Sequence, residues 1–149
     1  FDKVEEQTGL PVIVAVHPRI IMNDTYSMKF GDRELISDKT AQLVKDAKFI
    51  INHDSTATSF AALWRVPMIF VTTHQLERAE YTEMESQDQF FKTNRLNINN
   101  PYNNMDFFEI AQKPVSQYNR YIEKFIKVSG SPVQHSVEIL IQGLKKYVQ

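Results

Sequence analysis

Short apolar runs alternate with helical stripes along the first half of the chain. Residues 11–16 form a continuous apolar run rich in β-branched side chains, and residues 48–52 and 67–72 are two further runs. Such runs are typical of strands buried on both faces. The segments between them carry apolar residues at helical spacing, namely Thr40, Leu43, Val44 and Ala47 in one, and Ala57, Phe60, Ala61 and Trp64 in the other. This alternation predicts parallel βαβ units with right-handed crossovers, and so an α/β fold with a Rossmann-like parallel sheet and flanking helices.

The segments outside this alternation are more polar. Residues 20–36 are mixed and predict a loop, after which Ser37 or Asp38 is expected to cap the next helix. Residues 75–93 are polar and charged and predict one or two surface helices. Residues 95–99 predict a last short strand.

Two amphipathic stripes predict a helical C-terminal tail. Their apolar members are Tyr118, Tyr121, Ile122, Phe125 and Ile126 in the first, and Val137, Leu140, Ile141, Leu144 and Val148 in the second. Gly130 separates the two, and the second helix is expected to begin with Ser131 as its cap and Pro132 in its first turn.

The N-terminal residues predict the end of a helix that stops at Gly9, with a strand starting near Pro11. The chain begins with Phe1 rather than Met. We therefore expect a fragment, residues 1–149 forming one nucleotide-sugar-binding domain whose upstream acceptor-binding domain is missing. A processed N-terminus is the alternative.

Composition narrows the classes of function. A hydrophobic fraction of 42% and a charged fraction of 23% are ordinary for a globular domain, and the net charge of −1 provides no basic field for nucleic acid. The absence of cysteine excludes disulfides and thiolate metal sites and is compatible with a reducing cytoplasm. The apolar runs are too short to span a bilayer.

Polar clusters follow two of the predicted strands, where open parallel sheets bind ligands. The cluster after the second predicted strand is His53-Asp54-Ser55-Thr56. The hydroxyls of Ser55 and Thr56, with the free N–H groups of the following helix, would suit a phosphate or diphosphate. The competing interpretation, which local residue types alone favour, is that Asp54 or Ser55 only caps the helix. Thr72-Thr73-His74 ends the third strand in the same way.

The second cluster is His17-Pro18-Arg19. His17 can donate to a phosphate oxygen or a ribose hydroxyl, Pro18 stiffens the loop, and Arg19 can add a bidentate phosphate contact. The competing interpretation is a turn with a surface arginine. Thr40 opens the helix between the clusters, and we expect its methyl to be buried and its hydroxyl to face the loop.

Several familiar motifs are missing from the sequence. It has no G-x-G-x-x-G, no Walker A loop and no G-x-S-x-G elbow around Ser55. His17, His53 and Asp54 would ligate a metal only if the two loops met, and no compact ligand spacing supports such a site.

Taken together, the segments 12–19, 39–44, 51–57 and 66–70 resemble the C-terminal half of bacterial surface-polysaccharide glycosyltransferases of the GT-B type. Sialyltransferases and polysialyltransferases of this type carry a His-Pro and a Ser-Ser or Ser-Thr motif that hold the nucleotide and phosphate of a CMP-linked sugar, and teichoic-acid polymerases use similar elements on CDP-glycerol. The resemblance covers about residues 1–73. The matching residues are His17-Pro18 and Ser55-Thr56.

The resemblance implies a GT-B C-terminal domain that binds a CMP-, CDP- or UDP-linked sugar for transfer to a surface polysaccharide or lipid-linked acceptor. It implies His17 as the catalytic group at the leaving phosphate, and the donor-binding residues His17, Pro18, Arg19, Thr40, His53, Ser55 and Thr56. It implies no cofactor and no essential metal, an acceptor held by the missing domain, and a cytoplasmic enzyme that can associate peripherally with the inner face of the membrane. The fragment alone is expected to be inactive.

Two other functions fit the same residues. A non-hydrolysing UDP-N-acetylglucosamine 2-epimerase also places a His-Pro and a Ser near a nucleotide, and a product assay separates it from a transferase. The other alternative is a non-catalytic binding or regulatory module. A receiver-like domain would need an acidic pair after its first strand, and residues 16–18 supply none.

Overall fold

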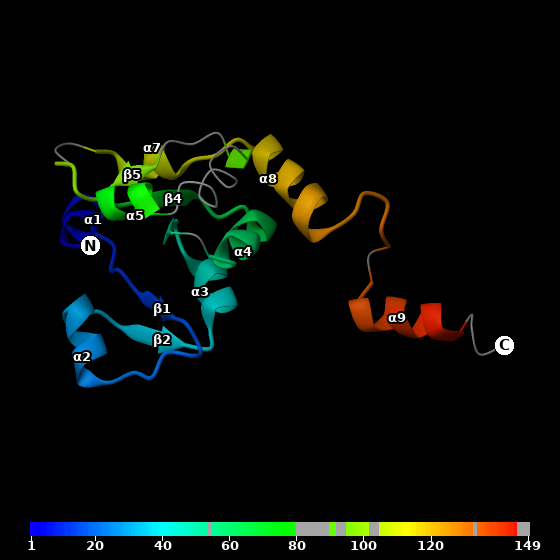
Figure 1. Cartoon of the computed structure of the whole chain (residues 1–149). Coiled ribbons are helices and arrows are strands. Elements are labelled where there is room, and N and C mark those ends of the chain that lie inside the picture. Colours follow the sequence, from blue (N-terminus) through cyan, green and yellow to red (C-terminus); the bar gives the residue numbers. More distant parts are fainter. Residues whose placement is uncertain (54, 80–89, 92–94, 102–104, 133, 146–149) are drawn as a thin grey trace.

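The chain forms a mixed α/β structure on two small parallel sheets flanked by helices (Figure 1). The computed structural model describes residues 1–53, 55–79, 90–91, 95–101, 105–132 and 134–145. The first sheet pairs β1 (Val14–Val16) with β2 (Leu35–Ser37). The second has the order β3 (Ile50–Asn52), β4 (Met68–Thr72) and β5 (Leu96–Asn97), all parallel.

The strands predicted at 11–16, 48–52, 67–72 and 95–99 are confirmed, with shorter bounds. The burial expected on both faces is found for β4 but not for β1, where Ala15 is exposed. The prediction of a loop across 20–36 was wrong in its middle, where residues 24–27 form a helix and residues 28–30 a 3₁₀ turn, and at its end, because β2 begins at Leu35. That strand has only two apolar residues and no alternation, so its signal was weak. The described strands also form two sheets rather than one, and a cavity is lined by residues of both β1 and β3.

Helices cover both faces of the second sheet. Met68 and Phe70 of β4 pack into a core shared with α3 (Thr40–Asp46) and α4 (Ala57–Trp64). Ile69, which points to the opposite face, packs with α1 (Asp2–Thr8) and α7 (Phe107–Ala111). Successive side chains of a strand alternate between faces, so β4 is buried on both sides, between these two groups of helices.

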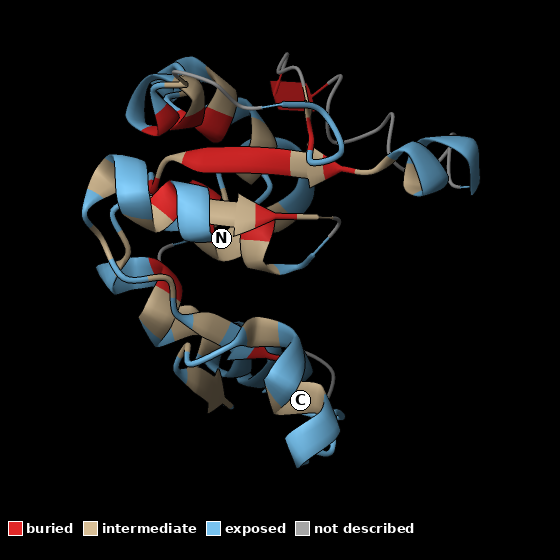
Figure 2. Ribbon diagram, turned by 90° about the vertical axis from the view of Figure 1, so that its left-hand side faces the viewer, coloured by how far each residue is buried: buried red, intermediate tan, exposed pale blue. Residues whose placement is uncertain are grey.

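Six further helical segments lie in the described part of the chain. They are α2 (Asp24–Ser27), the 3₁₀ turn η1 (Met28–Phe30), α5 (His74–Ala79), α8 (Val115–Tyr121), the π-helical turn η2 (Ile122–Ile126) and α9 (Ser136–Lys145). The C-terminal helix α9 is confirmed, but it begins at Ser136, so the expected start at Ser131-Pro132 was wrong. It extends away from the sheets and is exposed along most of its length (Figures 1 and 2).

Left-handed backbone marks three element ends. Gly9 ends α1 at φ 67°, as the glycine stop predicted. Arg65 ends α4 at φ 57°, and Asp38 joins β2 to α3 at φ 59°. The expected cap from Ser37 or Asp38 is wrong: Ser37 is the last residue of β2, Lys39 occupies the N-cap, and no described side chain caps α3.

Charge pairing and a backbone hydrogen bond hold α1 against the chain that leads into β1. The guanidinium of Arg33 donates to the carboxylates of Asp2 and Glu5, and Glu5 also accepts the backbone N–H of Val12 over 2.9 Å. The Val12 N–H and Arg33 lower the pKa of Glu5, and Arg33 lowers that of Asp2. These contacts anchor the chain just before β1.

Candidate functional site

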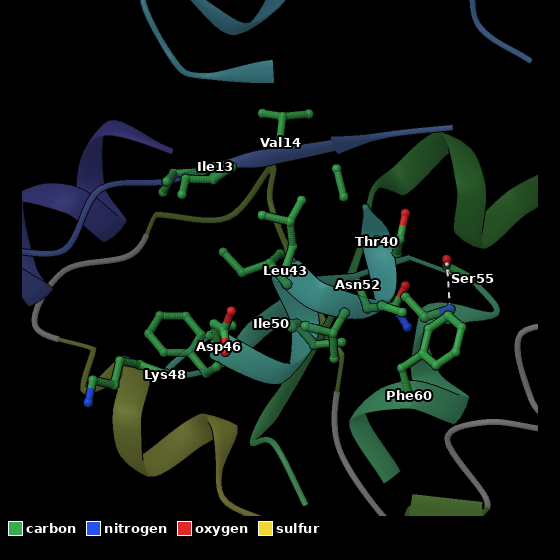
Figure 3. Close-up of a pocket in the computed structure, with 18 of the residues that line it drawn as sticks. Ile13, Val14, Thr40, Leu43, Asp46, Lys48, Ile50, Asn52, Ser55 and Phe60 are labelled. Atoms are coloured by element: carbon green, nitrogen blue, oxygen red, sulfur yellow. Dashed lines mark hydrogen bonds between the residues drawn. The ribbon is translucent and has the colours of Figure 1, made fainter. Parts of the chain in front are cut away.

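A cavity of about 970 Å³ lies between β1, α3 and β3 (Figure 3). Its walls are mainly apolar and include Val12, Val14, Leu43 and Ile50. Polar residues line the end to which both strands run, with Thr40, Asn52 and Ser55 close together in Figure 3. The carboxyl ends of β1 and β3 therefore open onto one space.

Residues of both strand-end clusters line this cavity. Its lining includes His17 and Pro18 after β1, Thr40 at the start of α3, and Ser55 and Thr56 after β3. All five residues were expected to belong to one ligand site, and they line one cavity in the structure. Whether a ligand binds there stays a prediction.

Two other predicted site residues do not line the cavity, Arg19 and His53. The imidazole Nδ1 of His53 lies 3.1 Å from the carbonyl oxygen of Val71 on β4. A carbonyl only accepts, so this nitrogen carries the hydrogen. His53 thus ties β3 to β4, while Asp54 lies outside the described residues.

Hydrogen bonding selects the tautomer of His17. The backbone N–H of Arg19 donates to Nδ1 of the His17 imidazole over 3.1 Å. A backbone N–H can only donate, so Nδ1 offers its lone pair and the neutral ring carries its hydrogen on Nε2. The turn is closed by the N–H of Ile20, which donates to the His17 carbonyl over 2.9 Å. His17 therefore presents a hydrogen-bond donor without having to be protonated.

The N-terminus of α4 differs from the expected row of free N–H groups. The N–H of Ala57 donates to the Ser55 hydroxyl oxygen over 3.2 Å, and that of Thr58 to the Ser55 carbonyl over 3.0 Å. The N–H of Ser59 donates to the Thr56 carbonyl over 3.0 Å. Thr56 occupies the N-cap of α4 without a side-chain cap bond, so the interpretation of Ser55 as the cap was wrong, although its hydroxyl oxygen accepts from the first N–H of the helix; the expectation that these N–H groups are free was wrong as well. What Ser55 can still offer is the hydrogen of its hydroxyl group, because its oxygen acts as the acceptor here.

Asn52 is a cavity residue that the sequence analysis missed. It ends β3 and is only 5% exposed, and its amide donates to the hydroxyl of Thr58. This bond joins the end of the strand to the first turn of α4. The signal in the sequence was an amide closing an otherwise apolar strand, where a buried polar group needs a partner.

The charged residues of the cavity are few. Asp38 follows β2 and lines the cavity two residues before Thr40, while Asp46 and Lys48 lie at the other end (Figure 3). Within the described part of the chain, no three His, Asp or Glu side chains are grouped to hold a metal ion.

Polar residues also gather at the carboxyl ends of β4 and β5, outside the cavity. Thr72 is buried, and the N–H of His74 donates to the Asn99 side-chain oxygen over 2.9 Å. The Asn97 amide nitrogen lies 2.9 Å from His74 Nδ1 and 2.9 Å from Glu77 Oε1. Only the strand-end position of Thr72-Thr73-His74 pointed to this cluster in the sequence.

Comparison with known proteins assigns no family to this chain. No family model matches it, and searches of curated proteins and of solved structures found no significant match. The site therefore has to be interpreted from its own geometry. Among the described residues, no helix is long and apolar enough to cross a membrane.

Proposed function

We propose that the chain is the donor-binding domain of a glycosyltransferase, which transfers a sugar from a CMP-, CDP- or UDP-linked donor to a surface polysaccharide or lipid-linked acceptor. In this proposal the two sheets belong to one Rossmann-like unit of the GT-B type. The observation that carries it is the shared cavity of His17 and Ser55, which follow different strands.

The chemistry of the polar end suits a phosphate. His17 offers its Nε2–H, and Ser55 and Thr56 offer hydroxyl hydrogens, so three donors come from two loops. Transfer from a nucleotide-sugar leaves negative charge on the departing phosphate. Donors that are already in place stabilise that charge without reorganising in the transition state.

The cavity walls suit the rest of a nucleotide. Binding pockets for small ligands are mostly apolar with a few placed polar groups, and this one combines Val12, Val14 and Leu43 with the polar end. In the proposal the acceptor, and the base that activates it, belong to another part of the intact enzyme. The described residues would bind the donor without turnover.

Calorimetric titration with CMP, CDP and UMP tests the proposal. We expect binding at millimolar or lower dissociation constants, weakened on the order of tenfold in His17→Ala and in Ser55→Ala, since each loses a hydrogen bond to a charged group. His135→Ala and Ser129→Ala are matched controls, because both residues are exposed and lie outside the cavity. A folded protein that binds none of the three nucleotides would contradict the proposal.

A further inference from the structure

Two strands that line the cavity, β1 and β3, are each paired on one side. Among the described residues, β1 bonds to β2 and β3 bonds to β4, and the two pairs belong to separate sheets (Figure 1). Both strands run towards the polar end of the cavity. Two strand edges of the same direction therefore flank one largely apolar space.

The backbone bonds identify the groups on these two edges. The N–H of Val14 donates to the carbonyl of the residue before β2, and that of Ile50 to the carbonyl of the residue before β4, each over 2.9 Å. The peptide groups of successive residues in a strand point to opposite edges, so those of Ala15 and Ile51 point away from β2 and β4. Both residues line the cavity. An edge of this kind can pair with another strand.

The apolar run that contains β1 is less covered than such a sequence usually is. Residues 11–16 are continuously apolar, yet Ile13 is 45% exposed and Ala15 is exposed as well. Val14 of β1 and Ile50 of β3 are half-buried on the cavity wall. Bringing the two strands together would remove this apolar surface from water, which is favourable.

Two short connections join the β1–β2 unit, residues 12–37, to the rest of the chain. One begins at Gly9, which ends α1 at φ 67°, and the space around this glycine is open. The other is Asp38-Lys39 before α3, where Asp38 has φ 59°. Hinges are typically a few loop positions of this kind that absorb changes in φ and ψ.

The anchored end of the β1–β2 unit lies away from the polar loops. Glu5 accepts the N–H of Val12, just before β1, and Arg33, just before β2, pairs with Asp2 and Glu5. The side chain of Asp2 is 83% exposed, and exposed ion pairs contribute little, so this anchor allows the unit to rotate. Such a rotation moves the carboxyl end of β1 relative to β3.

We propose that the β1–β2 unit closes onto β3, and that a nucleotide in the cavity holds the two apart. In the closed form β1 and β3 pair as parallel strands, in one sheet of the order β2-β1-β3-β4-β5. The cavity is then filled by its own walls, and the nucleotide binds only the open form, so closure lowers its apparent affinity. Closure itself is independent of the function proposed above, whereas its effect on nucleotide binding rests on that function.

Parallel pairing restricts the register of the closed form. A residue whose peptide groups point across lies opposite one whose groups point away, as Val14 and Leu35 do between β1 and β2. The two nearest registers place Ala15 opposite Ile50, or Val14 opposite Ile51. Adjacent strands are about 4.8 Å apart, which is within the range of Cα separations that a disulfide spans.

Cysteine pairs test closure, because the chain has no cysteine of its own. Ala15→Cys/Ile50→Cys reports the first register and Val14→Cys/Ile51→Cys the second. In the full chain without ligand and with diamide as oxidant, we expect one of these pairs to form an intramolecular disulfide, detected by thiol labelling and mass spectrometry. Ala15→Cys/Ser129→Cys is the control, with its second cysteine at an exposed site outside the cavity, and should form none.

CMP is expected to compete with closure. At about ten times its dissociation constant it leaves about one-eleventh of the chain free, so the disulfide should form roughly tenfold more slowly. Once the disulfide has formed, the chain should no longer bind CMP, and reduction with dithiothreitol should restore binding.

Hydrogen exchange in the unmodified chain tests closure without substitutions. The N–H groups of Ala15 and Ile51 gain partners in the closed form, so we expect both to exchange more slowly without CMP than with it. Equal or faster exchange without CMP, in a chain that binds CMP, would contradict the competition.

The failures of the two proposals are distinguishable. If neither cysteine pair forms a disulfide in folded variants, closure is overturned, and CMP binding by the unmodified chain leaves the donor site standing. If a disulfide forms equally fast with saturating CMP, the competition is overturned. If the unmodified chain does not bind CMP, the donor site fails, and disulfide formation without ligand still decides closure.

Discussion

The backbone N–H of Arg19 donates to Nδ1 of His17, and this bond leaves Nε2 as the ring nitrogen that can act as a donor. It also gives Arg19 a role different from the one expected of its side chain, which does not line the cavity. The position contributes through its main chain, so Arg19→Ala should preserve the tautomer of His17.

The tautomers themselves can be measured. At a pH where both rings are neutral, we expect ¹⁵N chemical shifts to report the Nε2–H form for His17 and the Nδ1–H form for His53, because their Nδ1 atoms face a donor and an acceptor respectively. His17→Ala and His53→Ala assign the signals. An Nδ1–H form of His17 would contradict the geometry of the turn.

Asp38 is expected to oppose phosphate binding. Asp38 is one of the residues that line the cavity with the proposed phosphate donors, so replacing its carboxylate with an amide removes a repulsive charge. We expect Asp38→Asn to tighten pyrophosphate binding roughly three- to fivefold, measured by calorimetry at low ionic strength. Asparagine tolerates left-handed backbone as aspartate does, so φ 59° is no obstacle. Unchanged or weaker binding in a folded variant would refute the expectation.

Tyr118 ties α8 to the end of α4. Its hydroxyl is buried and donates to the Val66 carbonyl over 3.0 Å, and burial raises its pKa to about 12. Tyr118→Phe leaves that carbonyl without its donor and should lower the free energy of unfolding by about 1 kcal/mol at neutral pH, measured by urea denaturation.

The raised pKa of Tyr118 determines the direction in which stability changes with pH. The neutral form is favoured in the fold, so its contribution to stability is complete below the unfolded pKa of about 10 and is lost as pH rises towards 12. The stability difference between the unmodified chain and Tyr118→Phe should therefore shrink over that window. A difference that stays constant would show that Tyr118 ionises as readily folded as unfolded, and Tyr26→Phe serves as control.

Arg65 ends α4 with left-handed backbone, and a glycine suits that conformation better. Its N–H donates to the Ala61 carbonyl, as in a helix C-cap. Comparing Arg65→Gly with Arg65→Ala cancels the loss of the side chain. We expect the glycine variant to be the more stable by about 1 kcal/mol in thermal or urea unfolding. An alanine variant of equal or greater stability would disagree with φ 57° at this position.

Local patterns predicted the elements better than their arrangement. The helix over residues 57–64 and the strand at Met68–Thr72 follow from spacing and apolar runs, because β4 is buried on both faces and has little freedom. The strand at Leu35–Ser37 could not be predicted in this way. Its pairing with β1 depends on a partner about twenty residues earlier in the chain, and Leu35 and Ile36 alone provide no period.

In the candidate site, too, the sequence predicted which residues lie at strand ends but not how their atoms are paired. The position of His17, Ser55 and Thr56 at strand ends was visible in the sequence, because parallel strands end at one edge. The hydrogen-bond partners of individual atoms could not be predicted from the sequence. In the structure, His53 bonds to the Val71 carbonyl and Ser55 accepts from Ala57. The Asn97 amide bonds to both His74 and Glu77.

The central claim is that one ligand binds the loops after β1 and β3 together. The most direct test is a titration of the ¹⁵N-labelled chain with CDP, followed by NMR at both loops. We expect the signals of His17 and of Ser55 and Thr56 to shift along isotherms with the same dissociation constant, while those of α9 stay unchanged. Shifts at one loop only, or different dissociation constants for the two, would contradict it.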